Sequence, residues 1–346
     1  MMAGVGVDAL LVTHLPNIRY LTGFTGSAGL LLVQSTRTVL VTDFRYAVQA
    51  GQEVGNAAGV EIDRASVWER LKRVLEQQPA ETLGIEAHAV TVRDAERISE
   101  RIRGRVAPTS DLVERLRASK SAGEVAAIRA AAELAQEALA EVLPTVRVGE
   151  RELDVAARLE SALRRRGSEW HPFQTIVASG PRSALPHART SHRQIGAGEW
   201  LLLDFGAQVD GYCADLTRTV AMGRADERQR EVYELVRAAQ ERARLQLRAG
   251  MSGREADALA RDLLTARGYG DAFGHSLGHG LGLEVHEGPR LAATVEAPLP
   301  AGAVVTVEPG IYIPGWGGVR LEDDVYLGAA GPELLSDGRT GLIELS

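Results

Sequence analysis

The chain has 346 residues, of which 45% are hydrophobic and 25% are charged, and its formal net charge is −7. A chain of this length exceeds the size at which one hydrophobic core usually stops growing, so we expect two domains of ordinary globular composition. Its basic residues are scattered arginines apart from Lys72 and Lys120. This distribution and the negative charge argue against nucleic acid or an anionic membrane as a partner.

The single cysteine, Cys213, excludes an intramolecular disulfide framework and a thiolate metal cage. We interpret it as a small core residue, and its isolation fits a reducing, cytoplasmic location. No apolar run approaches the roughly 18 residues of a membrane span. The N-terminus lacks a basic leader before its apolar part, so we expect no secretory signal.

In the first 120 residues, short apolar runs alternate with amphipathic stretches. The predicted strands are Ala9–Val12, Leu30–Val33 and Thr38–Thr42, and the predicted helices are Val67–Gln77 and Thr91–Ile102. This alternation predicts an α/β domain with a mostly buried sheet. A polar segment over residues 117–123 follows, so we expect domains at 1–120 and 121–346.

The second domain contains an internal repeat of helix pairs. The predicted pairs are Glu124–Val142 with Arg151–Arg166, and Asp226–Leu247 with Arg254–Arg267. The second helices of the two pairs are similar in sequence, and each ends at a glycine. The repeat predicts two related halves around a pseudo-twofold axis, with a site on the face between them.

A predicted hairpin places two aspartates side by side. The apolar run that ends at Asp204 returns through Asp210-Gly211, a dipeptide typical of two-residue hairpin turns. Such a turn pairs Asp204 with Thr217, and Asp215 then faces the same side of the sheet.

Burying adjacent carboxylates costs several kcal/mol each unless a cation offsets them. For this pair alone, Arg218 or Arg320 explains the charges as well as a metal does. Two more acids follow apolar runs, however. Glu308 ends the run from Val304, and Glu322 lies in Gly318–Leu327, where we expect it to share a strand face with Arg320.

Four inner acids exceed what scattered arginines neutralise, whereas two divalent cations would bring four positive charges. Oxygen-dominated ligation suits Mn²⁺, Co²⁺, Fe²⁺ or Zn²⁺. On charge alone, Glu308 and one of the aspartates are the candidates to bridge two metals.

The segment Gly274–Pro289, GHSLGHGLGLEVHEGP, supplies histidines that complete this set. Its glycines allow the backbone to approach another group closely. Taken alone, the segment is an unassigned metal or acid/base site. We expect His14, His171 and His192, which lie elsewhere, to be structural.

Together these residues resemble the pita-bread metallopeptidases, in the branch of Xaa-Pro aminopeptidase (aminopeptidase P) and prolidase. The resemblance rests on Asp204, Asp215, His279, Glu308 and Glu322, on Pro186-His187, and on GHGLGLEVH at residues 278–286. Residues 20–24 and 42–46, YLTGF and TDFRY, resemble the creatinase-type N-terminal domain of that branch. The resemblance implies an α/β (α+β) protein in which a smaller creatinase-like domain precedes a pita-bread catalytic domain.

The resemblance also implies a role for each site residue. Asp204 would chelate one metal, Asp215 and Glu322 would bridge both, and His279 and Glu308 would complete the other shell. The bridging roles differ from those that charge alone favours. His187 and His286 would contact the substrate, and Glu308 would carry a proton. His275 and Arg320 would support them and contribute to substrate binding.

The implied activity is release of the N-terminal residue from peptides with proline in second position, Xaa-Pro-Yaa. The first alternative is an Xaa-Pro dipeptidase, for which Arg290 or Arg320 is a candidate to hold the substrate's terminal carboxylate. Creatinase and non-catalytic pita-bread binding proteins are expected to lack some of the five ligands, and a methionine aminopeptidase is disfavoured by the extra domain. We further expect a cytoplasmic homodimer with two divalent metals, Mn²⁺ first, then Co²⁺ or Zn²⁺.

Overall fold

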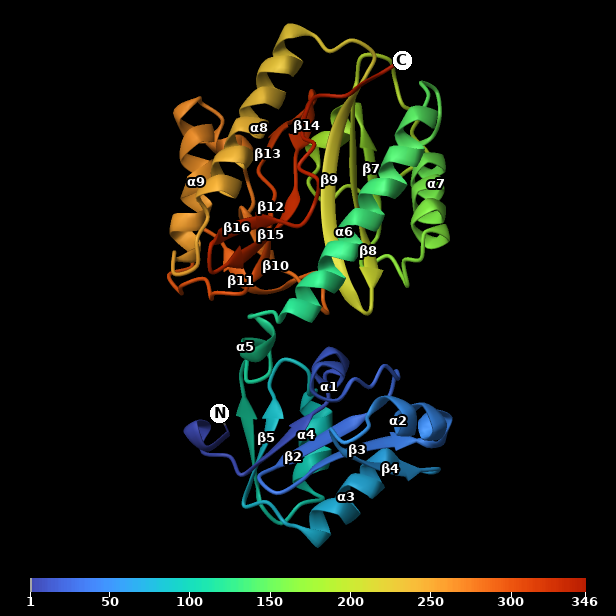
Figure 1. The fold of residues 1–346 in the computed structure, drawn as a ribbon, viewed down its shortest axis with the longest axis vertical. Helices are drawn as coiled ribbons and strands as arrows, with labels where there is room; N and C mark the ends of the chain where they lie inside the picture. Colours follow the sequence, from blue (N-terminus) through green and yellow to red (C-terminus); the bar gives the residue numbers. More distant parts are fainter. Residues whose placement is uncertain (1) are drawn as a thin grey trace. The chain divides into compact units, whose positions relative to one another are not determined.

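The computed structural model describes residues 2–346, which divide into two compact units between Arg117 and Ala118 (Figure 1). The strands of the first unit are β1 (Ala9–Val12), β2 (Leu30–Gln34), β3 (Thr38–Asp43), β4 (Gly59–Asp63), β5 (Thr82–Glu86) and β6 (Arg105–Thr109). They form one sheet in the order β4-β3-β2-β1-β5-β6. β1 is antiparallel to β2 but parallel to β5, which is in turn parallel to β6.

Helices cover both faces of this sheet. They are α1 (Leu15–Thr22), α2 (Ala47–Glu53), α3 (Val67–Gln77), α4 (Val92–Ser99) and α5 (Glu114–Arg117), with 3-10 turns at Met2–Val5 and Phe44–Tyr46. Alternate residues of β1 belong to two apolar clusters: Leu11 packs with α3 and α4, and Leu10 packs with α1 and α2. The predicted α/β domain is confirmed, although β4, β5 and β6 were not predicted.

The second unit contains two helix pairs and eleven strands. The helices are α6 (Ala122–Val142), α7 (Glu152–Arg165), α8 (Glu227–Gln246) and α9 (Gly253–Ala266), with 3-10 turns at Leu143–Thr145, Gly180–Ala184 and Gly270–Ala272. The strands are β7 (Ile176–Ser179), β8 (Trp200–Val209), β9 (Tyr212–Met222), β10 (Gly278–Gly280), β11 (Glu287–Leu291), β12 (Val304–Val307), β13 (Gly310–Ile313), β14 (Gly317–Arg320), β15 (Asp323–Gly328), β16 (Gly331–Leu334) and β17 (Glu344–Leu345).

These strands form three sheets, in the orders β17-β9-β8-β7, β11-β10-β12-β15-β16 and β13-β14. One apolar cluster joins α6 and α7 to β8 and β9, and another joins α8 and α9 to β12 through β15. Figure 1 shows the strands between the two helix pairs. The four predicted helices are confirmed. Ser121 and Ser252 begin α6 and α9 with capping boxes, in which side chains satisfy the free N–H groups of the first turn.

The β8–β9 hairpin has the predicted register. Asp210 and Gly211 have φ angles of 48° and 75°, the left-handed values that a type I′ turn requires at both positions. Asp204 pairs with Thr217 and Gly206 pairs with Asp215, so Asp204 and Asp215 lie on one face.

The expected single strand over Gly318–Leu327 is wrong. The chain leaves β14 at Arg320 and enters a different sheet as β15. Between the two strands, the Glu322 N–H donates to Thr217 O of β9 at 3.1 Å. The backbone at Glu322 therefore bonds to β9 and not to the partner strands of β14 or β15. The side chains of Arg320 and Glu322 nevertheless both reach the Thr217 hydroxyl, at 3.0 and 2.5 Å.

Among the described residues, no helix is both long and apolar enough to cross a membrane.

Replacing Gly206 with alanine is predicted to destabilise the second unit. A methyl group there would lie 2.3 Å from the Ala214 carbonyl oxygen and 2.7 Å from Pro172 Cγ. We expect Gly206→Ala to lower the free energy of unfolding by about 1–3 kcal/mol, the usual cost of overpacking. In the control, Gly123→Ala in α6, the added methyl group meets no described atom within 4 Å apart from its chain neighbours and its own helix backbone, so we expect slight stabilisation. Denaturant unfolding followed by tryptophan fluorescence measures both; equal effects would contradict the packing argument.

Candidate metal centre

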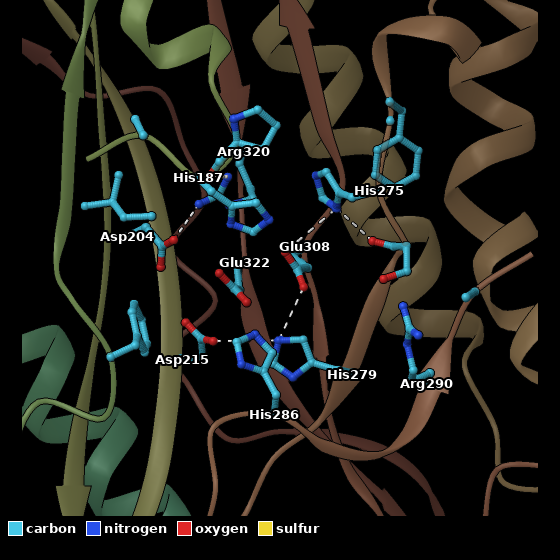
Figure 2. A pocket seen from close by; sticks show the side chains of 18 of the residues that line it. His187, Asp204, Asp215, His275, His279, His286, Arg290, Glu308, Arg320 and Glu322 are labelled. Atoms are coloured by element: carbon cyan, nitrogen blue, oxygen red, sulfur yellow. Dashed lines mark hydrogen bonds and ion pairs between the residues drawn. The ribbon is translucent and has the colours of Figure 1, made fainter. Parts of the chain in front are cut away.

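The second unit holds a cavity of about 1070 Å³ into which side chains from several strands converge (Figure 2). Its lining includes all five predicted metal ligands: Asp204 of β8, Asp215 of β9, His279 of β10, Glu308 directly after β12, and Glu322 between β14 and β15. Ligand atoms of Asp215, His279 and Glu322 lie within 4.8 Å of one another. The sheet that contains β8 and β9 and the sheet that contains β10 and β12 therefore contribute side chains to one cluster.

The arginine alternative explains only part of this charge. Arg320 Nη2 donates to Asp204 Oδ2 at 2.6 Å. Arg218 instead pairs with Asp323 at 2.7 Å. Within the described part of the chain, the buried atoms Asp204 Oδ1 and Asp215 Oδ1 have no hydrogen-bond partner. Buried carboxylate oxygens without a donor are costly, so this geometry favours a cation at the cluster.

The electrostatics agree with the geometry. Burial, reinforced by Glu322 and Asp204, raises the pKa of Asp215 well above its ordinary value. Burial and the Glu322 charge do the same to the pKa of Glu308. Burial and Asp204 raise the pKa of Glu322 to about 8. Without metal, the cluster therefore retains protons near neutral pH, and divalent cations are the alternative source of positive charge.

The His279 ring is neutral and presents a free nitrogen lone pair to the cluster. Its Nδ1 lies 3.0 Å from Gly280 O, and because a carbonyl only accepts, Nδ1 carries the hydrogen. The lone pair is then on Nε2, which lies 3.8 Å from Asp215 Oδ2 and 3.5 Å from Glu308 Oε1. Desolvation, with the neighbouring His286, lowers the pKa of His279 to about 4, which keeps the ring neutral. One imidazole among carboxylates is a donor set that fits Mn²⁺, Co²⁺ or Zn²⁺.

A hydrogen-bonded chain that includes Tyr312 was not predicted from the sequence. Arg320 Nη1 donates to the Tyr312 hydroxyl at 2.9 Å, and that hydroxyl lies 2.8 Å from His275 Nε2. His275 Nδ1 faces the Ser276 carbonyl at 2.8 Å, so Nε2 accepts from Tyr312. This series of hydrogen bonds fixes Arg320 beside Asp204. No motif marks Tyr312, because its role depends on contacts with residues from other elements.

The remaining predicted residues also line the cavity. Figure 2 shows His187 beside Arg320 and Asp204, and His286 beside His279. The His279 and His286 ring centroids are 4.2 Å apart. Both His187 and His286 are exposed. His275 Nδ1 lies 4.0 Å from Glu308 Oε2.

A buried ion pair lies next to His286 and was also not predicted. Lys120 Nζ donates to Glu287 Oε1 at 2.7 Å, and the side chains are 1% and 7% exposed. Glu287 lines the cavity and is the neighbour of His286 in the chain. The pair therefore fixes the backbone that carries His286.

Comparison with known proteins identifies the family. Residues 126–329 match the profile of Metallopeptidase family M24, and residues 1–119 match that of the Creatinase/Prolidase N-terminal domain. The chain belongs to metallopeptidase family M24. It is 35% identical to an Xaa-Pro dipeptidase of Pyrococcus horikoshii, over 97% of this chain and 95% of that protein.

Solved structures of M24 relatives cover nearly all of the chain. The Xaa-Pro dipeptidase from Bacillus anthracis superposes with a TM-score of 0.97 at 40% identity, covering 99% of this chain and 97% of that one. The X-Pro aminopeptidase from Thermotoga maritima gives 0.92 at 38% identity, with the same coverage. The comparisons confirm the predicted fold class and the predicted enzyme class, a metallopeptidase that acts on peptides. The M24 family implies divalent metal ions.

The stability of the metal-free M24 enzyme is predicted to depend on pH. The folded pKa of Glu322, about 8, lies above the roughly 4.3 of an unfolded glutamate. A group of this kind stabilises the fold fully below its unfolded pKa, and that stability is lost as the pH rises through the folded pKa. We expect the Tm of chelator-treated protein to fall between pH 5 and 8. Mn²⁺ should abolish this fall, because the metal replaces the protons. A Tm that stays level or rises in metal-free protein would contradict the prediction.

Loss of the Lys120 charge is predicted to impair catalysis. Lys120→Met leaves the Glu287 carboxylate buried without its ammonium partner, which costs about 3–5 kcal/mol of stability in comparable pairs. Displacement of the His286 backbone should lower kcat/KM by about 10- to 100-fold. The matched control is Lys72→Met. The Lys72 side chain is 41% exposed, and its Nζ forms only a long ion pair, 3.9 Å, with Glu76 Oε1. Wild-type kcat/KM in metal-loaded Lys120→Met protein would refute this role.

Proposed function

We propose that this peptidase hydrolyses the Xaa-Pro bond of dipeptides with the help of two divalent metals. The proposed ligands are Asp204, Asp215, His279, Glu308 and Glu322, which share one cavity. The sequence favoured an aminopeptidase over a dipeptidase. The observation that changes this preference is that the Arg290 guanidinium lines the cavity without a bonded partner among the described residues.

Arg290 is a cationic residue of the cavity lining that is available to bind a substrate carboxylate. Arg320 is already bonded to Asp204, Tyr312 and Thr217, and Arg261 is bonded to Asp257. Arg290 lines the cavity and is exposed, and its side chain has no hydrogen bond or ion pair with any described residue.

The sheet register brings Arg290 close to the cluster. Arg290 of β11 pairs directly with His279 of β10. Figure 2 shows its side chain extending into the cavity on the His279 side. In an Xaa-Pro dipeptide, the terminal carboxylate lies on the residue whose nitrogen leaves, within about one residue length of the scissile bond. An unpaired guanidinium on the residue paired with His279 suits that carboxylate.

The chain's own residues account for the remaining steps. When bound, the metals would supply a nucleophilic water at neutral pH and polarise the scissile carbonyl. We infer that His187 and His286 donate to the carbonyl oxygen as negative charge develops on it. In this proposal, Glu308 carries a proton to the proline nitrogen. Arg320, held by Tyr312, keeps Asp204 in position.

A second candidate is the Xaa-Pro aminopeptidase that the sequence favoured. The cavity, at about 1070 Å³, is at the upper end of the range for small-ligand sites, so it has room for a longer peptide. The similarity to an X-Pro aminopeptidase supports the same candidate. Manganese as the metal, a homodimer and a cytoplasmic location stay predictions.

Substrates that differ only at the C-terminus test the proposal. We expect the wild-type enzyme to cleave Xaa-Pro with a higher kcat/KM than Xaa-Pro-amide or Xaa-Pro-Yaa. Arg290→Gln should raise KM for Xaa-Pro by about 10- to 100-fold, since a hydrogen bond to a charged group contributes about 1.5–3 kcal/mol. It should leave the amide unaffected.

Arg189→Gln is the matched control, because Arg189 is another exposed arginine of the cavity lining. Faster cleavage of Xaa-Pro-Yaa by the wild type would replace the dipeptidase with the aminopeptidase. No cleavage of any Xaa-Pro substrate by the metal-loaded enzyme would refute both.

A further inference from the structure

Three side chains at one edge of the first unit's sheet form a second cluster with metal-binding chemistry. β1, β5 and β6 are adjacent and parallel, so their carboxyl ends meet at the same edge. His14 follows β1, His88 follows β5 and Glu114 follows β6. In α/β sheets, ligands bind characteristically beyond the carboxyl ends of neighbouring parallel strands.

The three side chains are close enough to share an ion. One ligand atom from each lies within 4.8 Å of the other two. His88 Nε2 is 3.4 Å from Glu114 Oε1, and the two imidazole centroids are 5.0 Å apart. With metal bonds of about 2.0–2.1 Å, tetrahedral zinc places its ligands roughly 3.3 Å apart. The ligand atoms would therefore approach one another by up to about 1.5 Å when zinc binds.

A buried hydrogen-bond network holds this arrangement. Glu86 Oε2 accepts from the backbone N–H of Thr13 at 2.7 Å and of His14 at 2.8 Å. The Asn17 side chain, fully buried, donates to Glu86 Oε1 at 2.6 Å and to Glu114 Oε1 at 2.5 Å. The backbone of His14 and the carboxylate of Glu114 are therefore anchored to one support. Outer partners of this kind orient ligands in metal sites.

We propose that His14, His88 and Glu114 bind a zinc ion, with water in the remaining position. Two imidazoles and one glutamate are a ligand set that zinc uses when it keeps one position open. His88 is 41% exposed, which gives an ion a route to the site.

Zinc stoichiometry of the full-length protein tests this site. The protein is stripped with a chelator and equilibrated with Zn²⁺, and zinc per chain is then measured by atomic emission. We expect His88→Ala to bind one zinc fewer than the wild type. The double variant Asp215→Asn/His279→Ala disrupts the proposed ligands of the cavity. Adding His88→Ala to it should remove one further zinc.

Competition with a chromophoric chelator measures the affinity. Loss of His88 should weaken zinc binding by more than the roughly 10–100-fold that loss of an outer partner costs. His171→Ala is the matched control, since His171 also contacts a neighbouring aromatic ring but belongs to no such cluster among the described residues. Mn²⁺-supported peptidase activity of His88→Ala should equal that of the wild type, which verifies folding. Equal zinc counts with and without His88, in both backgrounds, would overturn the site without bearing on the peptidase proposal.

Discussion

Four carboxylates that face one cavity place the main electrostatic constraint on the second unit. Their mutual repulsion and burial are unfavourable in the absence of cations, and the raised pKa values of Asp215, Glu308 and Glu322 express this cost. One arginine offsets part of the charge at Asp204. The unsatisfied oxygens and the neutral His279 nitrogen make divalent metals the chemically fitting solution.

The fold creates this constraint by joining strands from two sheets. The β8–β9 hairpin supplies both aspartates, and strands that pack with the other helix pair bring His279, Glu308 and Glu322. Thr217 connects the two groups, because its hydroxyl contacts Arg320 and Glu322. Packing of the apolar strands against the helix pairs thus offsets the electrostatic cost of the site and holds its residues in position.

The sequence predicted much of this arrangement because its strongest patterns are local. The Asp210-Gly211 turn determined the register of the aspartates, and the helix pairs were evident from periodicity and capping residues. Other features depend on contacts between distant residues. Only the structure reveals that the strand breaks after Arg320 and that Arg320 bonds to Tyr312. The same holds for the unpaired Arg290 in the cavity. The cluster containing His14 was equally inaccessible, since its members are far apart in the chain.

The most direct measurement is anomalous diffraction from crystals of the full chain soaked in Mn²⁺. We predict two manganese peaks in the cavity, ligated between them by Asp204, Asp215, His279, Glu308 and Glu322. A cavity with no peak under saturating Mn²⁺, or with Arg320 retained as the sole cation among the four carboxylates, would contradict it.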